Sequence, residues 1–580
     1  MKWTRQPGFW PSFVAMCIPL LLSALEGSIT NTALPTISSA LNLGTAFSWP
    51  ATAFLLASTI FQPLYSQLGD MWGRKVPMMV AVVVFGIGSV IAGVSSSGSV
   101  LIFGRVVQGL GTGGIDLFAE MVLCDIVPLR KRGPYLAIKH VVFAVGTTLG
   151  PLLGGVFAEH GWRWCFFINI PVCAISAVVI WKWLNVGGGI KTNDIKMTEE
   201  LKKIDIWGTA LLTASVVMVL VALSTGGAPR PWTHAQILVP LVLGLLGLVA
   251  FPFYECSQWC KHPIMPLRIF SNRTSKIAYI LTTLHGFITY GFQFYLPPYF
   301  QAVKESSPTQ SGLEVMPTTL VIVVLAAAGG PLLSCWGRYK PIHICGFASM
   351  TLGLGLCTML AKSTPVGAWL AFQLLVASGS GIVISSLLPA VQVRLPDDTN
   401  GASAGSWAFL RGTGSLFGVA LPGAVFNLRF AQVLPTIEHE GARAQLANGR
   451  AYQHASSSFT SSFGATVQQQ IVTGFTQSLK WAWIVFAVAA GVGLVLAFWE
   501  KEHKMRKELN SAYGLKAPKS GNGTTNGTDK AGCAGPGEDR GPGWGMGTLP
   551  CGSEATLSDG RAKADEGEDE ADLEKGLRGP

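Results

Sequence analysis

The sequence predicts an all-α, polytopic membrane protein. Its 580 residues are 49% hydrophobic and only 13% charged, with a mean hydropathy of +0.42, whereas a soluble protein carries about 25% charged residues to hydrate its surface. Uncharged runs such as residues 76–94 and 237–254 are close to the roughly 20 apolar residues that cross a bilayer as a helix. The 68 glycines are consistent with helices in a lipid bilayer, because small residues let membrane helices pack closely.

The apolar segments divide the chain into fourteen predicted transmembrane helices. They cover residues 13–35, 47–67, 76–95, 101–125, 136–158, 164–184, 206–224, 236–255, 277–300, 312–334, 342–361, 368–391, 402–427 and 481–499. Lys and Arg mark the cytoplasmic side of such proteins. With a cytoplasmic N-terminus, the short inside loops hold sixteen of them and the short outside loops four. The net charge of +10 therefore reports orientation in a lipid bilayer, and we expect no nucleic-acid partner.

A short internal repeat indicates two related bundles. SQLGDMWGRK (66–75), after the second span, shares a leucine and Trp-Gly-Arg at the same spacing with GPLLSCWGRY (330–339), after the tenth. Transporters are often built from such repeats. The expected parts are an N-terminal six-helix bundle (1–184), a linker with two inserted spans (185–276), a C-terminal six-helix bundle (277–500) with a long extracytoplasmic loop (428–480), and a tail (501–580). The tail composition predicts cytoplasmic disorder, and its charged start, 500–509, is a helix candidate.

Several motifs, in chain order, resemble those of the major facilitator superfamily, and more narrowly its fourteen-helix drug:proton antiporter branch of fungi. The matching segments are LEGSITNTALP (25–35), SQLGDMWGRK (66–75), LIFGRVVQGLGTGG (101–114), GTTLGPLLGG (146–155), GWRWCFFINIP (161–171) and FLRGTGSLFGVA (409–420). Two residues depart from the family pattern: Glu26 replaces the usual aspartate and Ser66 the usual glycine. The resemblance implies the major facilitator fold, with two inserted helices, and a monomeric transporter.

Polar residues form one stripe on the fourth span. At 100° per residue, Arg105, Asp116 and Glu120 lie within about 60° of one another. Arg105 and Asp116 are about 16 Å apart along the axis, so we expect no direct pair between them. Unpaired charges in a span must face water or other helices, and the stripe therefore predicts a polar pathway. For Asp125, at the cytoplasmic end, pairing with Arg130 or Arg132 is a sufficient structural explanation.

The resemblance places helices 1, 4, 9 and 12 around a central cavity. The proton-coupling candidates are Glu26, Arg105, Asp116 and Glu120, of which Glu26 holds the family position for the acid; Asp116 and Glu120 lie outside the general motif and are alternatives for substrate recognition. The substrate-cavity candidates are Asn31, His285, Thr289, Phe292, Gln293 and Tyr299, most of them on one face of the ninth span. Such an apolar, aromatic wall suits a flat hydrophobic substrate. For His285 a packing role is an equal alternative, and Arg411 is expected to be structural on a peripheral helix.

Two further motifs are candidates for conformational change. For Asp70, Gly73, Arg74 and Lys75, the resemblance implies a latch between helices 2 and 11; the alternative is an ordinary positive-inside loop. Gly146, Gly150 and Gly154 recur every four residues and predict a close-packed helix face. Pro151 within that face permits a bend. Close packing alone is a sufficient explanation of these residues, whereas the resemblance implies a hinge for alternating access.

We therefore expect proton-coupled efflux of drugs, toxins or secondary metabolites across the plasma membrane, with both termini cytoplasmic. The proton gradient is the expected energy source, without a cofactor. The alternatives are proton-coupled uptake or vacuolar-membrane transport of basic amino acids or siderophores, and a non-transporting sensor. An enzyme is not expected, because the sequence shows no catalytic triad or phosphate-binding loop. No metal site is expected either: Cys256 and Cys260 lie one turn apart but lack a second pair.

Overall fold

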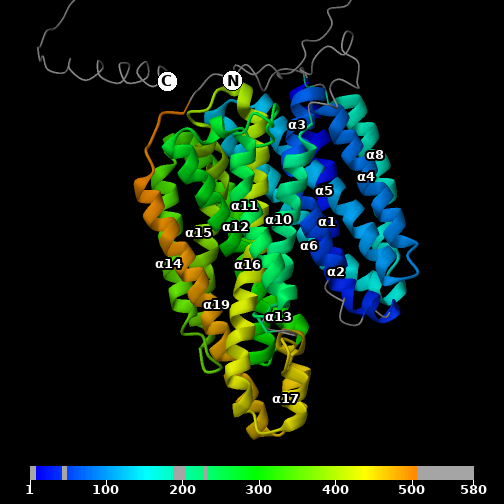
Figure 1. Ribbon diagram of the computed structural model, residues 1–580, viewed down its shortest axis with the longest axis vertical. Coiled ribbons are helices and arrows are strands. Elements are labelled where there is room, and N and C mark those ends of the chain that lie inside the picture. Colours follow the sequence, from blue (N-terminus) through cyan, green and yellow to red (C-terminus); the bar gives the residue numbers. More distant parts are fainter. Residues whose placement is uncertain are drawn as a thin grey trace, which may run out of the picture. The chain divides into compact units, whose positions relative to one another are not determined.

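The computed structural model describes residues 8–41, 43, 49–184, 186, 204–226 and 231–505, in which almost all regular structure is helical. The first six predicted spans correspond to helices α1 to α8 (Figure 1). Their bounds are α1 Phe9–Ala40, α2 Trp49–Ile60, α3 Gln62–Trp72, α4 Lys75–Gly93, α5 Gly98–Ile126, α6 Arg132–His160, α7 Trp164–Phe167 and α8 Asn169–Trp183.

The remaining eight predicted spans also coincide with helices. Their bounds are α10 Ile206–Thr225, α11 Ala235–Glu255, α12 Arg273–Pro298, α13 Pro308–Trp336, α14 Lys340–Cys357, α15 Val366–Gln392, α16 Asn400–Val433 and α19 Ala465–Trp499. Within the described residues, eleven helical stretches are long and apolar enough to cross a membrane. The all-helical, polytopic class predicted from composition is confirmed.

Proline divides two of the predicted spans into two helices each. The second span breaks at Phe61, because Pro63 stands in the first turn of α3 and cannot continue the backbone hydrogen bonding of α2. The sixth span breaks at Ile168, between α7 and α8. Pro171 follows there and lacks the N–H that would bond to the preceding turn.

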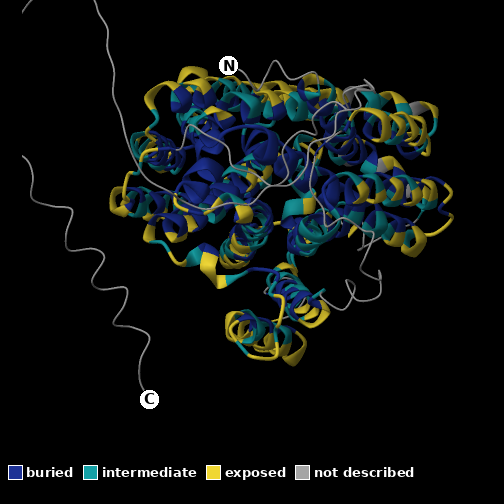
Figure 2. Ribbon diagram, turned by 90° about the horizontal axis from the view of Figure 1, so that it is seen from above, coloured by how far each residue is buried: buried dark blue, intermediate teal, exposed yellow. Residues whose placement is uncertain are grey.

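The helices pack in two groups. In the first, α1 lies against α6 and α5 lies against α2 and α4; in the second, α12 lies against α16 and α15 lies against α13 and α14. The groups meet where α6 packs on α13 and α3 on α16, and α10 contacts both α2 and α16. Buried residues fill the helix interfaces, whereas the outward faces are exposed (Figure 2).

The outward faces are apolar, as a lipid-facing surface requires. Val83 and Ile87 on α4 are about half exposed, as are Leu246 and Val249 on α11. A protein in water seldom exposes such a continuous apolar surface. These faces are consistent with a membrane as the surrounding solvent.

Residues 428–480, predicted as a loop, are largely helical. Helix α16 continues to Val433 and α19 begins at Ala465, with the short helices α17 (Glu440–Leu446) and α18 (Ser457–Thr460) between them. The polar composition that suggested a loop is compatible with helices that extend beyond the apolar layer. Residues 500–505 are not helical, so the described part of the 500–509 segment does not form the expected helix, and the rest of the predicted tail lies outside the described residues.

The two copies of the Trp-Gly-Arg repeat have similar backbone roles. Gly73 ends α3 with φ 78°, and Gly337 ends α13 with φ 69°. Residues with a side chain seldom adopt such positive φ values, whereas glycine does so readily. The repeat therefore marks equivalent helix ends in the two groups of helices.

Candidate transport site

Glu26 on α1 and Arg105 on α5 form a buried ion pair. Arg105 Nη1 donates to Glu26 Oε1 at 2.5 Å, and both residues are at most 1% exposed. The other carboxylate oxygen, Oε2, accepts from Asn169 Nδ2 at 2.6 Å, and Thr30 Oγ1 donates to Oε1 at 2.8 Å. The expectation that the charges of the α5 stripe are unpaired is therefore wrong for Arg105, because neighbouring helices supply its partners.

The network around this pair joins five helices, because Arg105 Nε also donates to the Pro50 carbonyl of α2 at 3.1 Å. Arg105 also donates to Gln108 Oε1 at 2.7 Å, and Gln108 Nε2 donates to Ser89 Oγ on α4 at 2.9 Å. Asn169, from α8, is fully buried. The Arg105 guanidinium lies over the Phe54 ring, 4.1 Å from its centroid, which supplies a further attraction for the cation. A change of charge at Glu26 therefore affects contacts of α1, α2, α4, α5 and α8.

A second group of charges lies further along α5. Lys139 of α6 forms a buried ion pair with Glu120, and Ser23 of α1 donates to Asp116 Oδ1 at 2.8 Å. Asp116 is half-buried and also interacts electrostatically with Lys139. Sequence reasoning missed Lys139, although a lysine inside the predicted span 136–158 is itself a signal of a functional or paired charge.

Arg411 on α16 faces this group from the other half of the molecule. Its charge acts on Asp116, on His285 and on Tyr290, and among the described residues it forms no ion pair. Tyr290 is 38% exposed, so this region is not completely filled by protein side chains. Helix α16 packs on α12 and also contacts α5, and the structural role expected for Arg411 stays a prediction.

Two of the candidates on α12, Thr289 and His285, contact Ser380 of α15. Thr289 bonds to Ser380 Oγ of α15 at 2.7 Å, and His285 Nε2 lies 3.0 Å from the Ser380 carbonyl oxygen. These contacts are the ones expected if His285 has a packing role, the alternative to a role in the substrate cavity. Gln293 is half-buried, and the side chain of Asn31, in α1, lies outside the described residues.

Phe292 and Tyr299 do not form the expected cavity wall. Phe292 packs edge-on against Trp483 of α19, with ring centroids 5.6 Å apart. Tyr299 lies beyond the end of α12, in a π-helical turn, and its hydroxyl donates to the Ala361 carbonyl. Both are 1% exposed. The helix-face argument failed because α12 turns this face towards its own group of helices.

The loop motif after α3 is held by two ion pairs of the buried Arg74. Arg74 Nη1 donates to Asp70 Oδ1 at 2.8 Å, and Arg74 Nε donates to Asp125 Oδ2 at 2.7 Å. Asp125 therefore pairs with Arg74, not with Arg130 or Arg132 as expected. Lys75 donates to the Trp181 carbonyl at 2.6 Å.

In the other half of the molecule α3 packs on α16, the thirteenth predicted span, not on the eleventh as expected. A Cβ atom on Gly401, in the first turn of α16, would lie 2.1 Å from Asp70 Oδ1. Asp70 thus lies at the N-terminus of α16, where the helix dipole favours a negative charge. A latch at this contact stays a prediction.

The glycines of α6 face α1. A Cβ atom on Gly146 would lie 2.7 Å from the Leu21 carbonyl oxygen, and one on Gly154 would lie 2.6 Å from the Ile29 carbonyl oxygen. A Cβ atom on Gly150 would overlap the Ser28 side chain. Larger residues cannot be accommodated without a shift of the backbone. The side chain of Pro151 lies outside the described residues, and its role as a hinge stays a prediction.

Hydrogen bonds join the two halves at the ends that bear the basic loops. Arg132 donates to Gln392 Oε1 of α15, and Arg130 donates to the carbonyls of Ser334 and Cys335 at the end of α13, at 3.3 and 3.5 Å. Contacts between α3 and α16 lie at the same end. The molecule is thus closed on its predicted cytoplasmic side.

Comparison with known proteins identifies the family. Residues 16–419 match the family model of the Major Facilitator Superfamily. The MFS-type transporter gkaD of Penicillium citrinum is 40% identical over 89% of this chain and 88% of its own. The MFS-type efflux transporter pyiT of Pyricularia grisea is 40% identical over 86% and 84%, and the efflux pump FUS6 of Gibberella fujikuroi 37% identical over 88% and 92%.

Solved structures agree on the fold. The proton:xylose symporter XylE superposes with a TM-score of 0.54 at 13% identity, over 87% of this chain and 98% of its own. The human organic anion transporter MFSD10 superposes with a TM-score of 0.51 at 15% identity, over 82% and 100%. The chain belongs to the Major Facilitator Superfamily, and the resemblance found in its motifs is confirmed. It is a secondary transporter.

Proposed function

We propose that the protein exports small organic compounds from the cell in exchange for protons. The names of two relatives, an efflux transporter and an efflux pump, support the direction. The observation that carries proton coupling is the buried Glu26–Arg105 pair. A carboxyl group in a low-dielectric interior can hold a proton near neutral pH, and protonation removes the negative partner of Arg105.

The coupling follows from the network around Glu26. An ionised Glu26 holds Arg105, Asn169 and Thr30 together. A protonated Glu26 gives a weaker bond to Arg105, because charge-assisted hydrogen bonds are about twice as strong as neutral ones. The two protonation states thus favour different packing of α1, α5 and α8, which is what coupling to alternating access requires.

The charged residues between the two halves indicate the polarity and charge of the substrate. Asp116 and Arg411 offer charges of opposite sign beside the exposed Tyr290 ring. A largely apolar molecule with one polar or acidic group fits this surrounding. Uptake or vacuolar transport of basic amino acids stays the alternative, because Asp116 attracts a cation and Arg411 repels it; efflux is preferred on the names of the relatives.

The energy source in this proposal is the proton gradient, no cofactor takes part, and the chain works as a monomer in the plasma membrane. A growth screen of a deletion strain against organic toxins supplies a transported compound. Transport of that compound by reconstituted Glu26→Gln is then compared with wild type. We expect loss of pH-driven uphill transport and retention of substrate exchange, which needs no net proton movement.

The matched control is Glu440→Gln on α17, whose carboxylate is 92% exposed; it should transport like wild type. Full gradient-driven transport by Glu26→Gln would overturn the assignment of the carrier, and Asp116 would be tested next. A tail deletion that leaves flux intact would exclude the sensor alternative.

A further inference from the structure

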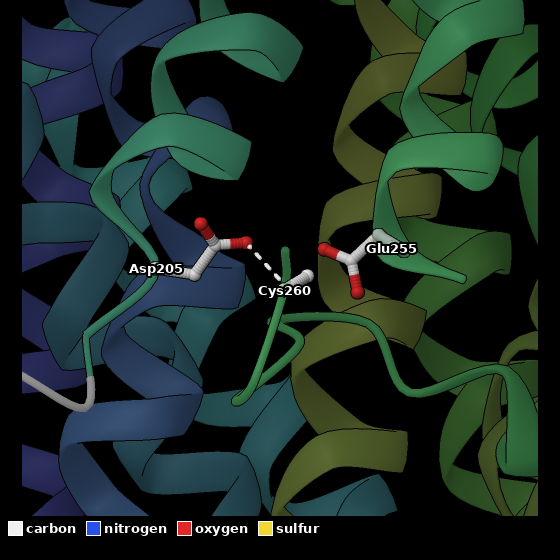
Figure 3. Close-up of side chains that lie close together, drawn as sticks. All are labelled: Asp205, Glu255 and Cys260. Carbon is white, nitrogen blue, oxygen red and sulfur yellow. Dashed lines mark hydrogen bonds between the residues drawn. The ribbon is translucent and has the colours of Figure 1, made fainter. Parts of the chain in front are cut away.

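Three potential metal ligands meet at the ends of the two inserted helices. Asp205 precedes α10, Glu255 ends α11, and Cys260 lies in the loop that follows (Figure 3). One ligand atom from each residue lies within 4.8 Å of the other two. Figure 3 shows the two carboxylates facing one another with Cys260 between them.

Glu255 is the residue that the protein alone does not satisfy. It is 6% exposed, and its Oε2 accepts from the Met265 amide at 3.3 Å. Its Oε1 has no hydrogen-bond partner among the described residues. A buried carboxylate oxygen without a partner is costly, and a cation at the centre of the cluster would satisfy it.

Hydrogen bonds to one carboxylate oxygen hold the Asp205 side chain in place. Its Oδ1 accepts from the Gly208 amide, as the N-cap of α10, and from the Tyr254 hydroxyl, both at 2.8 Å. Its Oδ2 faces the Cys260 sulfur at 3.3 Å. One oxygen therefore fixes the side chain while the other points into the cluster, a division of roles common in metal sites.

Cys260 completes the set with a sulfur ligand. Its thiol donates a hydrogen bond of 3.3 Å to Asp205 Oδ2. Binding a metal ion replaces that proton by the ion.

We propose that Asp205, Glu255 and Cys260 bind one divalent transition-metal ion of the zinc type. Thiolate with carboxylates suits Zn²⁺ rather than the oxygen-only preference of Mg²⁺ or Ca²⁺. Tetrahedral Zn²⁺ with bonds of about 2.0–2.3 Å places its ligand atoms about 3.3–3.6 Å apart. Donor atoms within 4.8 Å reach this spacing by side-chain movements of about 1 Å, and the fourth position is open to water.

The site is tied to the N-terminal half. Gln67 of α3 donates to the His262 carbonyl at 2.9 Å and accepts from the Asp205 amide at 3.3 Å. The same side chain thus touches both the segment before α10 and the loop after α11. A metal ion would fasten these two segments together beside the helix that carries Asp70.

The test uses the purified full-length protein and Co²⁺, whose thiolate complexes absorb by charge transfer. We expect one Co²⁺ per chain with a thiolate band, displaced by Zn²⁺. Cys260→Ser should abolish the band, and Glu255→Gln should weaken binding at least tenfold. Tyr254→Phe, which removes the bond that orients Asp205, should weaken it by about 10–100-fold.

Cys256→Ser is the matched control, because Cys256 lies in the same segment, is exposed and stands outside the cluster. It should bind like wild type. Thermal unfolding without metal checks that each variant is folded. The proposal is overturned if wild type shows no thiolate band, if Cys260→Ser keeps it, or if Cys256→Ser removes it. None of these readouts depends on transport.

Discussion

The charged residues within the membrane differ in how they are compensated. Glu26, Glu120 and Asp125 each have a basic partner within the N-terminal half. Buried charges require such partners, because an isolated ion is costly in a low-dielectric surrounding. Arg411 forms no ion pair in the described part of the chain, although its guanidinium lies 5.5 Å from the centroid of the Trp407 ring, and we infer that it is available to a ligand.

Removing one member of a buried pair should destabilise the protein. Lys139→Met leaves Glu120 buried without its cation, and we expect a loss of about 3–5 kcal/mol of unfolding free energy. The double variant Lys139→Met/Glu120→Gln should recover most of it, as measured by denaturant unfolding in detergent. Equal losses in the single and double variants would show that the pair itself contributes little.

Arg411 should select substrates by charge. Arg411→Gln is expected to raise the KM for an acidic substrate at least tenfold and to leave that for a neutral analogue unchanged, because only the acid gains from the guanidinium. Arg429→Gln is the control on the same helix, since Arg429 lies over Trp481 at 3.9 Å and bonds to Gln432. An equal effect on both substrates would indicate a structural role for Arg411.

At the scale of single elements, the α1–α6 contact shows what a sequence pattern can predict. Glycines at positions 146, 150 and 154 predicted a close-packed face, and the contacts with α1 lie on it. The same reasoning failed for Phe292 and Tyr299, because periodicity gives a shared face but not the helix that the face meets. The length of α19 was also missed, since hydropathy detects the apolar part of a helix and not its polar extension.

Alanine substitutions at two adjacent glycines of α6 should differ in their effect on stability. Gly154→Ala would place a methyl group 2.6 Å from the Ile29 carbonyl oxygen, whereas a Cβ on Gly155 meets nothing within 4 Å. We expect Gly154→Ala to lower the melting temperature and transport. Gly155→Ala should be neutral or slightly stabilising, because alanine is favoured over glycine within a helix by about 1 kcal/mol. Similar melting curves for both variants would contradict the close contact.

At the scale of the whole molecule, the fold was predictable and the site only in part. Each of the fourteen segments predicted from hydropathy and motif order coincides with helices of the structure, because both signals are local properties of the chain. The Glu26–Arg105 pair joins residues 79 positions apart, and the Asp205 cluster is brought together only when α10 and α11 pack. Glu26 and Arg105 could be selected as candidates, but their contact could not be inferred from spacing.

The orientation gives a prediction for glycosylation. Asn272, the N-cap of α12, lies in an Asn-Arg-Thr sequence on the predicted cytoplasmic side, so it should carry no glycan. Asn522 and Asn526, outside the described residues, should be unmodified for the same reason. The measurement is gel mobility before and after glycosidase treatment. A shift that disappears in Asn272→Gln would reverse the orientation.

The hydrogen bonds of Arg130 and Arg132 that join the two halves use uncharged acceptors. Arg130 and Arg132 donate across the two halves to main-chain carbonyls and to the Gln392 amide, not to carboxylates. Each such bond contributes about 1.5–3 kcal/mol and can be exchanged for water. Three such bonds together contribute about 4.5–9 kcal/mol. Because their acceptors are uncharged and water can replace them, the two halves can separate at these bonds without leaving a buried carboxylate unpaired.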